Sequence, residues 1–258
     1  MTRLQTRVAK AGWGDHRFRG HAVYAELLGR TSLSQLLGLA LGVNLSSDEG
    51  AFMDELAVSS TLADPHIWPL KLTRVAGAYG SSAMTGLASG LLATDGPLMG
   101  AGAVGPAAQW LHDLLKSYKS ATATAALIQE IMANRGRLPG FGVPARRVDE
   151  RVTSITNCVE ARGRDTLPHW SLWSLIVGQT RREKLEPNLA SAFSAAVLDL
   201  GFTPDCAASA MHLCLLPSFL ANAHEGAAQR PDVLKDMPAQ HLDYQGPARR
   251  VTTRASGS

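Results

Sequence analysis

The sequence predicts an all-α protein, and three observations support this fold class. Apolar residues recur at helical spacing in about nine or ten segments of the chain. Segments in which apolar and polar residues alternate, as in a half-buried strand, are almost absent. Hydrophobic residues make up 45% of the 258 residues and charged residues 18%, a balance typical of a compact protein with a well-buried core.

Capping residues and breaks in the apolar pattern define the expected elements. Ser32 can cap the first helix, and Gly42 can end it. Three segments are expected to be irregular or extended: the lead-in over 1–24, the glycine-rich loop over 95–106, and the Trp-rich segment 168–177, which is interpreted as strand-like. Helical segments are expected over residues 33–41, 48–59, 70–94, 107–134, 149–161, 188–200 and 204–225.

Charge and cysteine content argue against several classes of protein. The net charge of +3 is too small to indicate nucleic-acid binding without a concentrated basic stripe. The three cysteines form no Cys-x-x-Cys pair, so neither a disulfide framework nor a cysteine zinc site is expected, and no metal is assigned. No signal-peptide pattern is found, and no apolar run approaches the roughly 18 residues of a membrane span. We therefore expect a cytoplasmic protein.

Two glycine-proline motifs carry a family resemblance. Residues 138–152 read Leu-Pro-Gly-Phe-Gly-Val-Pro-Ala-Arg-Arg-Val-Asp-Glu-Arg-Val, and residues 95–100 read Asp-Gly-Pro-Leu-Met-Gly. The first resembles the Pro-Gly-Phe-Gly-His segment and following Asp-x-Arg of citrate synthases, and the second resembles the Gly-Pro-Leu-His-Gly of the same family. Both motifs lack the family's histidine, because Val143 and Met99 occupy those positions.

Two weaker motifs follow in the family's order. Residues 186–189, Glu-Pro-Asn-Leu, resemble the Lys-Pro-Asn-Leu that precedes the catalytic aspartate of citryl-CoA lyase modules. Residues 244–249 resemble a C-terminal Tyr-x-Gly-Pro. The resemblance covers roughly residues 25–250 and is greatest to short citryl-CoA lyase-like members. It implies a large helical domain over 1–105 and 206–250, a smaller inserted helical domain over 106–205, and a disordered tail over 251–258.

All three catalytic positions that the resemblance assigns are substituted. The family uses a carboxylate base, a histidine that stabilises the enolate, and a histidine that polarises the ketone. These positions carry Ser194, Met99 and Val143, and the last two cannot donate a useful hydrogen bond. Losing one preorganised donor costs about 100- to 1000-fold in rate, so ordinary citrate synthesis is not expected. We expect these three residues to line the substrate site instead.

The resemblance also implies binding roles for several residues that match the family's motifs. Arg151 matches the arginine that holds a substrate carboxylate, and Arg146 and Arg147 are candidates for CoA phosphates beside the turns at Gly140 and Gly142. The simpler interpretation of Arg151 is a salt bridge to Asp149 or Glu150.

A histidine and an aspartate are the candidate replacement acid and base. His66 and Asp64 resemble the Ala-Asp-His-Gly of citryl-CoA lyases, with the register shifted by one residue. The structural alternatives are a packed loop histidine and an aspartate that caps a helix starting at Pro65. His169, Trp170 and Trp173 are interpreted as core or interface packing.

Two functional hypotheses follow. The first is an enzyme that cleaves or forms a carbon-carbon bond on an acyl-CoA thioester with non-standard catalytic residues and no tightly bound cofactor. The second is a noncatalytic homologue that binds CoA esters or a partner protein as a regulatory or structural subunit. Both take an acyl-CoA or carboxylate ligand, and the resemblance implies a homodimer, with contact through the small-residue segment 75–93. Binding to nucleic acid or membranes is not expected.

Overall fold

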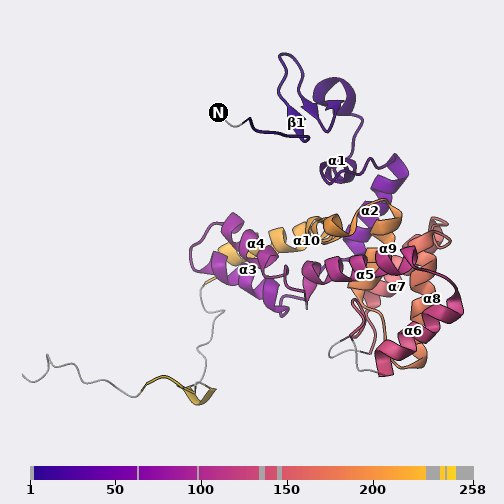
Figure 1. The fold of residues 1–258 in the computed structure, drawn as a ribbon. Helices are drawn as coiled ribbons and strands as arrows, with labels where there is room; N and C mark the ends of the chain where they lie inside the picture. Colours follow the sequence, from indigo (N-terminus) through magenta and orange to yellow (C-terminus); the bar gives the residue numbers. More distant parts are fainter. Residues whose placement is uncertain are drawn as a thin grey trace, which may run out of the picture.

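The computed structural model describes residues 3–62, 64–97, 99–133, 137–143, 147–230, 239–241 and 243–247. Within these ranges the fold is all-α, as predicted, with very little strand (Figure 1). The α-helices are α1 (Leu33–Ala40), α2 (Ser47–Ser59), α3 (Trp68–Ala78), α4 (Ala83–Leu92), α5 (Val104–Lys116), α6 (Ala121–Ala133), α7 (Glu150–Ala161), α8 (Pro168–Arg182), α9 (Leu189–Asp199) and α10 (Pro204–Ala227). The described residues also include two short 3-10 helices, η2 (Gly100–Ala103) and η4 (Ala239–His241).

The N-terminal lead-in is mostly extended, as expected, and projects from the helical body (Figure 1). Three two-residue strands, β1 (Ala9–Lys10), β2 (Arg17–Phe18) and β3 (His21–Ala22), form a small antiparallel sheet. A single π-helical turn, η1 (Val23–Leu27), follows. The Arg19 guanidinium donates to the carbonyl of Ala40 at 2.6 Å and so links this segment to α1.

Two serines start the first two helices through reciprocal capping. Ser32 accepts a hydrogen bond from the backbone of Gln35, whose side chain accepts from the backbone of Ser32. Ser46 and Glu49 repeat this arrangement at α2, where the sequence had indicated only an acidic start. Each pair satisfies backbone N–H groups that have no partner in the first turn of a helix.

The strand-like interpretation of residues 168–177 is wrong, because this segment forms the first part of α8. Pro168 starts the helix, and its fixed φ suits a first helical position. Trp170, Trp173 and Val177 are all buried. Their spacing of three and four residues places them on one helical face, whereas a strand would send Trp170 and Trp173 to opposite faces.

The glycine-rich loop is shorter than expected. It ends at η2, and Gly105 and Pro106 lie in the first turn of α5. The predicted helical stretch 107–134 is divided into α5 and α6 at residues 117–120, and its last residue, 134, lies outside the described residues.

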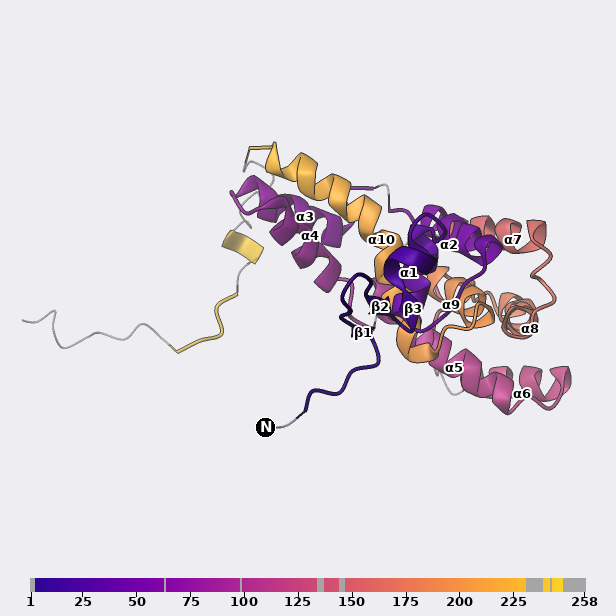
Figure 2. The ribbon, with the colours of Figure 1, turned by 90° about the horizontal axis from the view of Figure 1, so that it is seen from above.

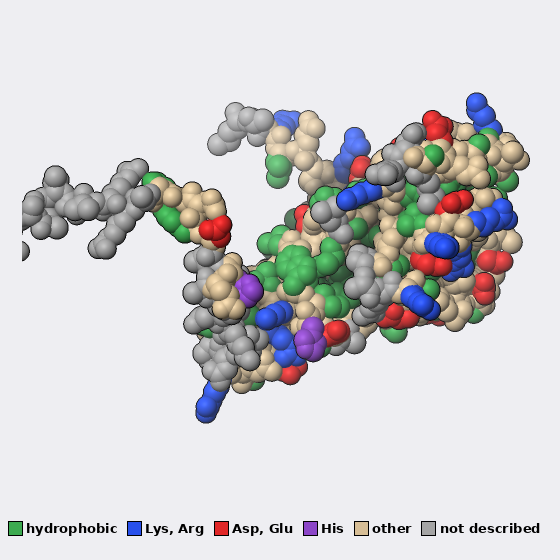
Figure 3. Space-filling view, turned by 90° about the horizontal axis from the view of Figure 1, so that it is seen from below, with side chains coloured by type: hydrophobic (Ala, Val, Ile, Leu, Met, Phe, Trp, Pro, Cys, Tyr) green, Lys and Arg blue, Asp and Glu red, His purple; other side chains and the backbone are tan. Residues whose placement is uncertain are grey.

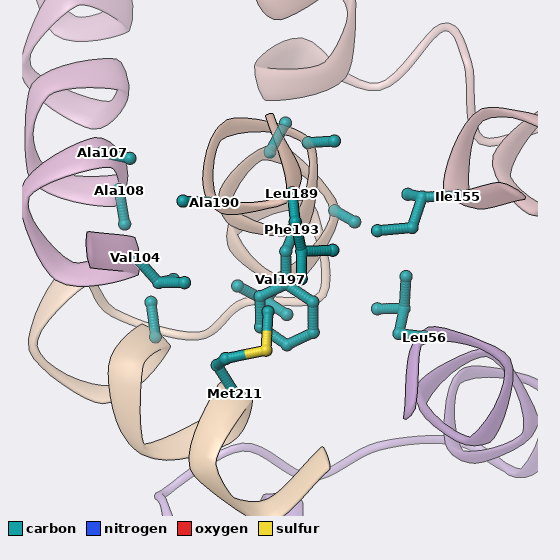
Figure 4. Close-up of a cluster of buried hydrophobic side chains, with 14 of the residues drawn as sticks. Leu56, Val104, Ala107, Ala108, Ile155, Leu189, Ala190, Phe193, Val197 and Met211 are labelled. Carbon is teal, nitrogen blue, oxygen red and sulfur yellow. The ribbon is translucent and has the colours of Figure 1, made fainter. Parts of the chain in front are cut away.

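Helix α9 lies at the centre of the core. Every residue from Leu189 to Leu198 is buried, which explains the continuous small and apolar sequence of this helix. Phe193 is fully buried and is surrounded by side chains of α2, α5, α7 and α10, among them Leu56, Ile155 and Met211 (Figure 4). Because α9 contacts α5, α7, α8 and α10, it holds the segments before and after it in one packed unit.

Helices α3, α4 and α10 pack side by side away from this core (Figure 2). Glycines make the close approach possible. A Cβ at Gly77 would lie 2.8 Å from the backbone nitrogen of Ala227, and one at Gly90 would overlap the Thr73 hydroxyl. Arg74 on α3 joins α10 through hydrogen bonds of 2.6 Å to Asn222 and to Glu225. The prediction of closely packed helices over 70–94 is confirmed.

In the described part of the chain, α10 alone has the length and apolar composition of a membrane span. The core helix of a soluble protein passes the same test, and α10 packs against α2, α3, α4, α5 and α9. The division into a large and a small domain stays a prediction. The tail over 251–258 lies outside the described residues.

Candidate active site

The loop that carries Met99 is held in a tight conformation. Gly100 has a φ of +77°, which favours glycine, and its position leaves no room for a Cβ beside Thr94. The backbone N–H of Gly102 donates to the carbonyl of Thr94 at 2.8 Å, closing the loop. Met99 directly precedes η2, and its residue surface is 38% exposed. The glycine spacing of the motif therefore presents Met99 at the molecular surface.

Trp68 connects Met99 to the loop that carries His66. The indole N–H of Trp68 donates to Met99 Sδ at 3.3 Å. Trp68 is the first residue of α3, only two residues after His66. Trp68 has no role predicted from the sequence, although its place between a candidate base and a proline is a usable signal. Met99, Trp68 and the 64–67 loop thus lie in one region.

Asp64 and His66 form a hydrogen-bonded pair. Asp64 Oδ1 lies 2.7 Å from His66 Nδ1 and accepts the backbone N–H of His66 at 2.9 Å. The His66 side chain is 93% exposed and that of Asp64 is 49% exposed. The alternative in which Asp64 caps a helix at Pro65 is wrong, because α3 begins at Trp68 after Ile67. The exposed pair is also unlike a packed loop histidine.

The turn around Gly140 and Gly142 pairs with the segment before α9. Gly142 N–H donates to the carbonyl of Glu186 at 2.7 Å, and Asn188 N–H donates to the carbonyl of Gly140 at 3.0 Å. The Asn188 side chain donates to the carbonyl of Gly142 at 2.9 Å. Two motifs more than 40 residues apart in the sequence are therefore joined. Val143, which ends this described turn, is partly buried.

Gly140 packs closely against the backbone of α9. Its φ is +79°, and an added Cβ would lie 2.6 Å from the Cβ of Ser191. Ser194 lies one turn further along α9 and is fully buried. Its hydroxyl lies 2.6 Å from the carbonyl of Ala190 and 3.1 Å from that of Val104. Helix α9 therefore touches both the 140–143 turn and the start of α5, but Ser194 faces the backbone in the core.

Arg151 is paired with Asp149 in the structure. Its Nε and Nη2 each donate to the Asp149 carboxylate at 2.8 Å, in the fork geometry that suits guanidinium. The Arg151 side chain is 30% exposed, whereas that of Asp149 is 4% exposed. The simpler interpretation of Arg151 as a salt-bridge partner is confirmed, and its substrate role stays a prediction.

Asp149 anchors this part of the site. The carboxylate also accepts the backbone N–H of Leu189 at 2.9 Å, so it caps the start of α7 and touches the start of α9. Burial acts to raise the pKa of Asp149, but the hydrogen bonds and charge of Arg151, together with the backbone N–H groups of Leu189 and Arg151, outweigh it and lower the pKa. Sequence reasoning had considered Asp149 only as a salt-bridge partner, because its contact with α9 is distant in sequence.

The remaining predicted residues are less informative. Arg147 is exposed, and Arg146 lies outside the described residues. The Tyr244 hydroxyl donates to the carbonyl of Pro247 at 3.1 Å within the C-terminal motif. No three His, Cys, Asp or Glu side chains converge as metal ligands in the described ranges.

Comparisons with known proteins agree with the motifs and the fold. The family model for the citrate synthase C-terminal domain matches residues 71–232, more than half of the chain. No curated protein matches the chain. The structure of citryl-CoA lyase from Hydrogenobacter thermophilus aligns over 98% of this chain and 99% of that chain, with a TM-score of 0.84 and 20% identity.

Larger relatives share the fold over part of their length. ATP citrate lyase from Methanothrix soehngenii, in complex with citrate and coenzyme A, aligns over 96% of this chain and 42% of that chain, with a TM-score of 0.77 and 16% identity. Citrate synthase from Thermoplasma acidophilum, in a ternary complex with carboxymethyl coenzyme A and oxaloacetate, aligns over 86% of this chain and 59% of that chain, with a TM-score of 0.63 and 17% identity. The chain therefore belongs to the citrate synthase family and has the all-α fold of its citryl-CoA lyase-like members.

Proposed function

We propose that this chain binds an acyl-CoA thioester and catalyses carbon-carbon bond cleavage or condensation with Asp64 and His66 as its acid-base pair. The observation that supports this proposal is the contact of Trp68 with Met99 at 3.3 Å, which brings the loop of Asp64 and His66 close to Met99. The motif resemblance assigns a catalytic histidine to the position of Met99. Two family relatives are described in complexes with coenzyme A or a CoA analogue, which supports the ligand class.

The geometry of the pair suits His66 to the role of base. An ionised carboxylate only accepts hydrogen bonds, so the 2.7 Å contact with Asp64 assigns the proton to His66 Nδ1. Nε2 then carries the lone pair. In the condensation direction, Nε2 takes a proton from the α-carbon of the thioester, the resulting enolate attacks the carbonyl carbon of the second substrate, and the imidazolium returns the proton to the alkoxide that forms. In cleavage, Nε2 takes the proton of that hydroxyl group as the carbon-carbon bond breaks, and the imidazolium then gives it to the α-carbon of the enolate.

In this proposal, arginine side chains bind the negatively charged groups of the ligand. Arg151 binds a substrate carboxylate through Nη1, and Arg146 and Arg147 bind phosphates of coenzyme A. Met99 and Val143 make the site less polar than one for oxaloacetate, since neither donates a hydrogen bond. We propose cytoplasmic action, in keeping with the absence of paired cysteine motifs.

A homodimer is part of the proposal. The small-residue helix α4 and its neighbour α3 expose large apolar residues, including Leu72, Met84 and Leu92. Figure 3 shows hydrophobic side chains gathered in the middle of one face of the molecule. A second copy that covered such a surface would remove apolar area from water. Light scattering tests this, and a monomer at micromolar concentration would refute it.

A noncatalytic CoA-ester-binding subunit is the second candidate. It is favoured by Ser194, whose buried hydroxyl points to the carbonyls of Ala190 and Val104 and cannot act as a surface base. With Met99 and Val143 also unable to stabilise charge, the family's three catalytic groups have no direct replacement at their own positions.

Proton exchange at the thioester separates the two candidates. The full chain is incubated with acetyl-CoA or a longer acyl-CoA in deuterium oxide, and deuterium in the acyl group is measured by mass spectrometry. The enzyme hypothesis predicts exchange above the uncatalysed rate, reduced about 100-fold or more in His66→Ala, the typical contribution of a general base. His212→Ala, on α10, is the control. Binding without exchange in the wild type favours the noncatalytic subunit.

A further inference from the structure

We propose that His112, His169 and Asp199 form a proton-sensitive joint that holds α5 against α8 and α9 and loosens as the pH falls. His112 Nδ1 lies 3.3 Å from His169 Nε2, and His169 Nδ1 lies 2.9 Å from Asp199 Oδ1. The two imidazole rings are stacked, with centroids 5.6 Å apart and an angle of 18° between their planes. We call these three residues the histidine joint.

Hydrogen-bond chemistry fixes the proton positions in this joint. The Asp199 carboxylate also accepts the backbone N–H groups of His169 at 3.0 Å and Trp170 at 2.8 Å, so it is an acceptor in three bonds. His169 Nδ1 must therefore carry a proton. In neutral His169, Nε2 accepts a hydrogen bond, and His112 must then donate from Nδ1.

The two facing nitrogens can share one proton but cannot both carry one. With a single proton between His112 Nδ1 and His169 Nε2 the hydrogen bond is kept, whichever ring donates it. With both rings fully protonated, the two facing nitrogens are both donors, and two cations are held 3.3 Å apart. A second proton therefore breaks the hydrogen bond between α5 and α8.

Burial and nearby positive charges make the doubly protonated pair of His112 and His169 unfavourable. The side chains of His169 and Asp199 are only 13% and 5% exposed. Burial lowers the pKa of His112, and the positive charges of Lys116 and His169 lower it further, whereas Asp113 acts in the opposite direction. On the other side of the joint, the Arg164 guanidinium lies 3.4 Å from the backbone carbonyl of Asp199.

The joint connects elements that also meet at the candidate active site. Helix α5 begins at Val104, just after the loop of Met99, and its Trp110 ring lies 6.4 Å from Phe141 in the 140–143 turn. Helix α9 ends at Asp199 and carries Ser191 and Ser194. Loosening the joint frees one end of both helices. The sequence interpretation of His169 as packing alone missed this arrangement, because its partners lie 57 and 30 residues away.

The sign of the pH dependence follows from linkage. A histidine whose pKa is lowered by folding binds its proton in the unfolded chain first. Stability is therefore complete above the ordinary histidine pKa of about 6.5 and is lost as the pH falls through the lowered value. Each unit of lowering corresponds to about a tenfold loss in the folding equilibrium constant.

The first measurement is nitrogen NMR of the histidine rings in the full chain at pH 8. Both His112 and His169 are expected to carry the proton on Nδ1, with Nε2 unprotonated. A proton on Nε2 of His169 in the neutral ring would overturn the joint. This result needs neither a ligand nor a variant, so it is independent of the proposed function.

The second measurement is urea unfolding at pH 7.5 and 5.5. His112→Asn keeps a donor toward His169 but cannot titrate, so its loss of stability between the two pH values is expected to be smaller than that of the wild type. His212→Asn is the control, because the His212 ring lies 3.0 Å from a carbonyl of its own helix. An equal loss in wild type and His112→Asn would contradict the proposal. If His112→Asn does not fold, the NMR measurement still tests the proposed hydrogen bond between His112 and His169.

Discussion

The Trp68 indole N–H donates to Met99 Sδ at 3.3 Å, so Met99 in the 95–100 motif is held by the first residue of α3. The thioether accepts only a weak hydrogen bond, and the pair leaves both side chains partly exposed. An apolar and aromatic surface thus lies beside the loop that carries Asp64 and His66. The consequences for ligand binding can be tested directly.

Trp68 should report the binding of a CoA thioester. Because its residue surface is 52% exposed, a ligand bound over Met99 should change the fluorescence of Trp68. Trp68→Phe removes this signal and should weaken binding, because it removes the indole N–H that holds the Met99 side chain. Trp13→Phe, on the exposed N-terminal segment, should change neither the signal nor the affinity. A full signal in Trp68→Phe would contradict this placement.

Asp149 should contribute strongly to stability. Asp149→Ala leaves Arg151 without its partner and removes the cap of α7, and we expect a loss of about 3 kcal/mol in the free energy of unfolding. The pKa of Asp149 is lowered in the folded chain, so its contribution is present above the ordinary aspartate pKa of about 3.9 and is lost as the pH falls through the lowered value. Urea unfolding at pH 7 and 3 measures both effects.

Glu160→Ala is the control for Asp149. Glu160 is exposed on the same helix, and its replacement should change the free energy of unfolding by less than about 0.5 kcal/mol. A similar loss of unfolding free energy in Asp149→Ala and Glu160→Ala would mean that the pair of Asp149 and Arg151 stabilises the fold no more than an exposed residue of α7 does.

Gly140 should tolerate a side chain less well than another glycine with positive φ. Gly140→Ala adds strain at a φ of +79° and brings a Cβ to 2.6 Å from Ser191, whereas Gly163→Ala adds only strain, because open space surrounds Gly163. We expect about 1–2 kcal/mol of loss at Gly163 and a larger loss at Gly140. Thermal unfolding of the two variants provides the comparison, and equal losses would show that the 140–143 turn can move away from α9.

Gly90 and Gly178 form a second matched pair, both within helices. A Cβ at Gly90 would overlap the Thr73 hydroxyl and approach Phe219, so Gly90→Ala should destabilise the packing of α3, α4 and α10. Gly178 has no neighbour within 4 Å, and Gly178→Ala should stabilise α8 by about 0.5–1 kcal/mol. Stabilisation by both substitutions would refute the close packing at Gly90.

Local features of the fold were predictable from the sequence. Ser32 before an apolar stripe and Gly42 after it defined α1, because capping depends on residues within one turn. The Trp-rich start of α8 was misinterpreted, since a short aromatic run suits either a strand or a buried helix. The period of three between Trp170 and Trp173 was the signal that favoured a helix.

The candidate site was predicted in its parts but not in its contacts. The motifs identified Met99, Val143 and Arg151, and their order indicated the family. The pairing of Met99 with Trp68, and of Asp149 with the start of α9, joins residues 31 and 40 positions apart. Such contacts depend on how helices pack, and no local pattern encodes them. Ser194 illustrates the same limit, because the sequence predicted a residue of the substrate site and the structure buries its side chain in the core.

Thermal unfolding of the full chain with coenzyme A, acetyl-CoA and longer or branched acyl-CoA esters tests the central claim most directly. A ligand at about 100 times its dissociation constant adds about 2.7 kcal/mol to the folded state. The proposed CoA-thioester site predicts a clear rise in melting temperature with at least one ester, and a smaller rise in Trp68→Phe. An unchanged melting temperature with every ester would contradict a CoA-ester function for this member of the family.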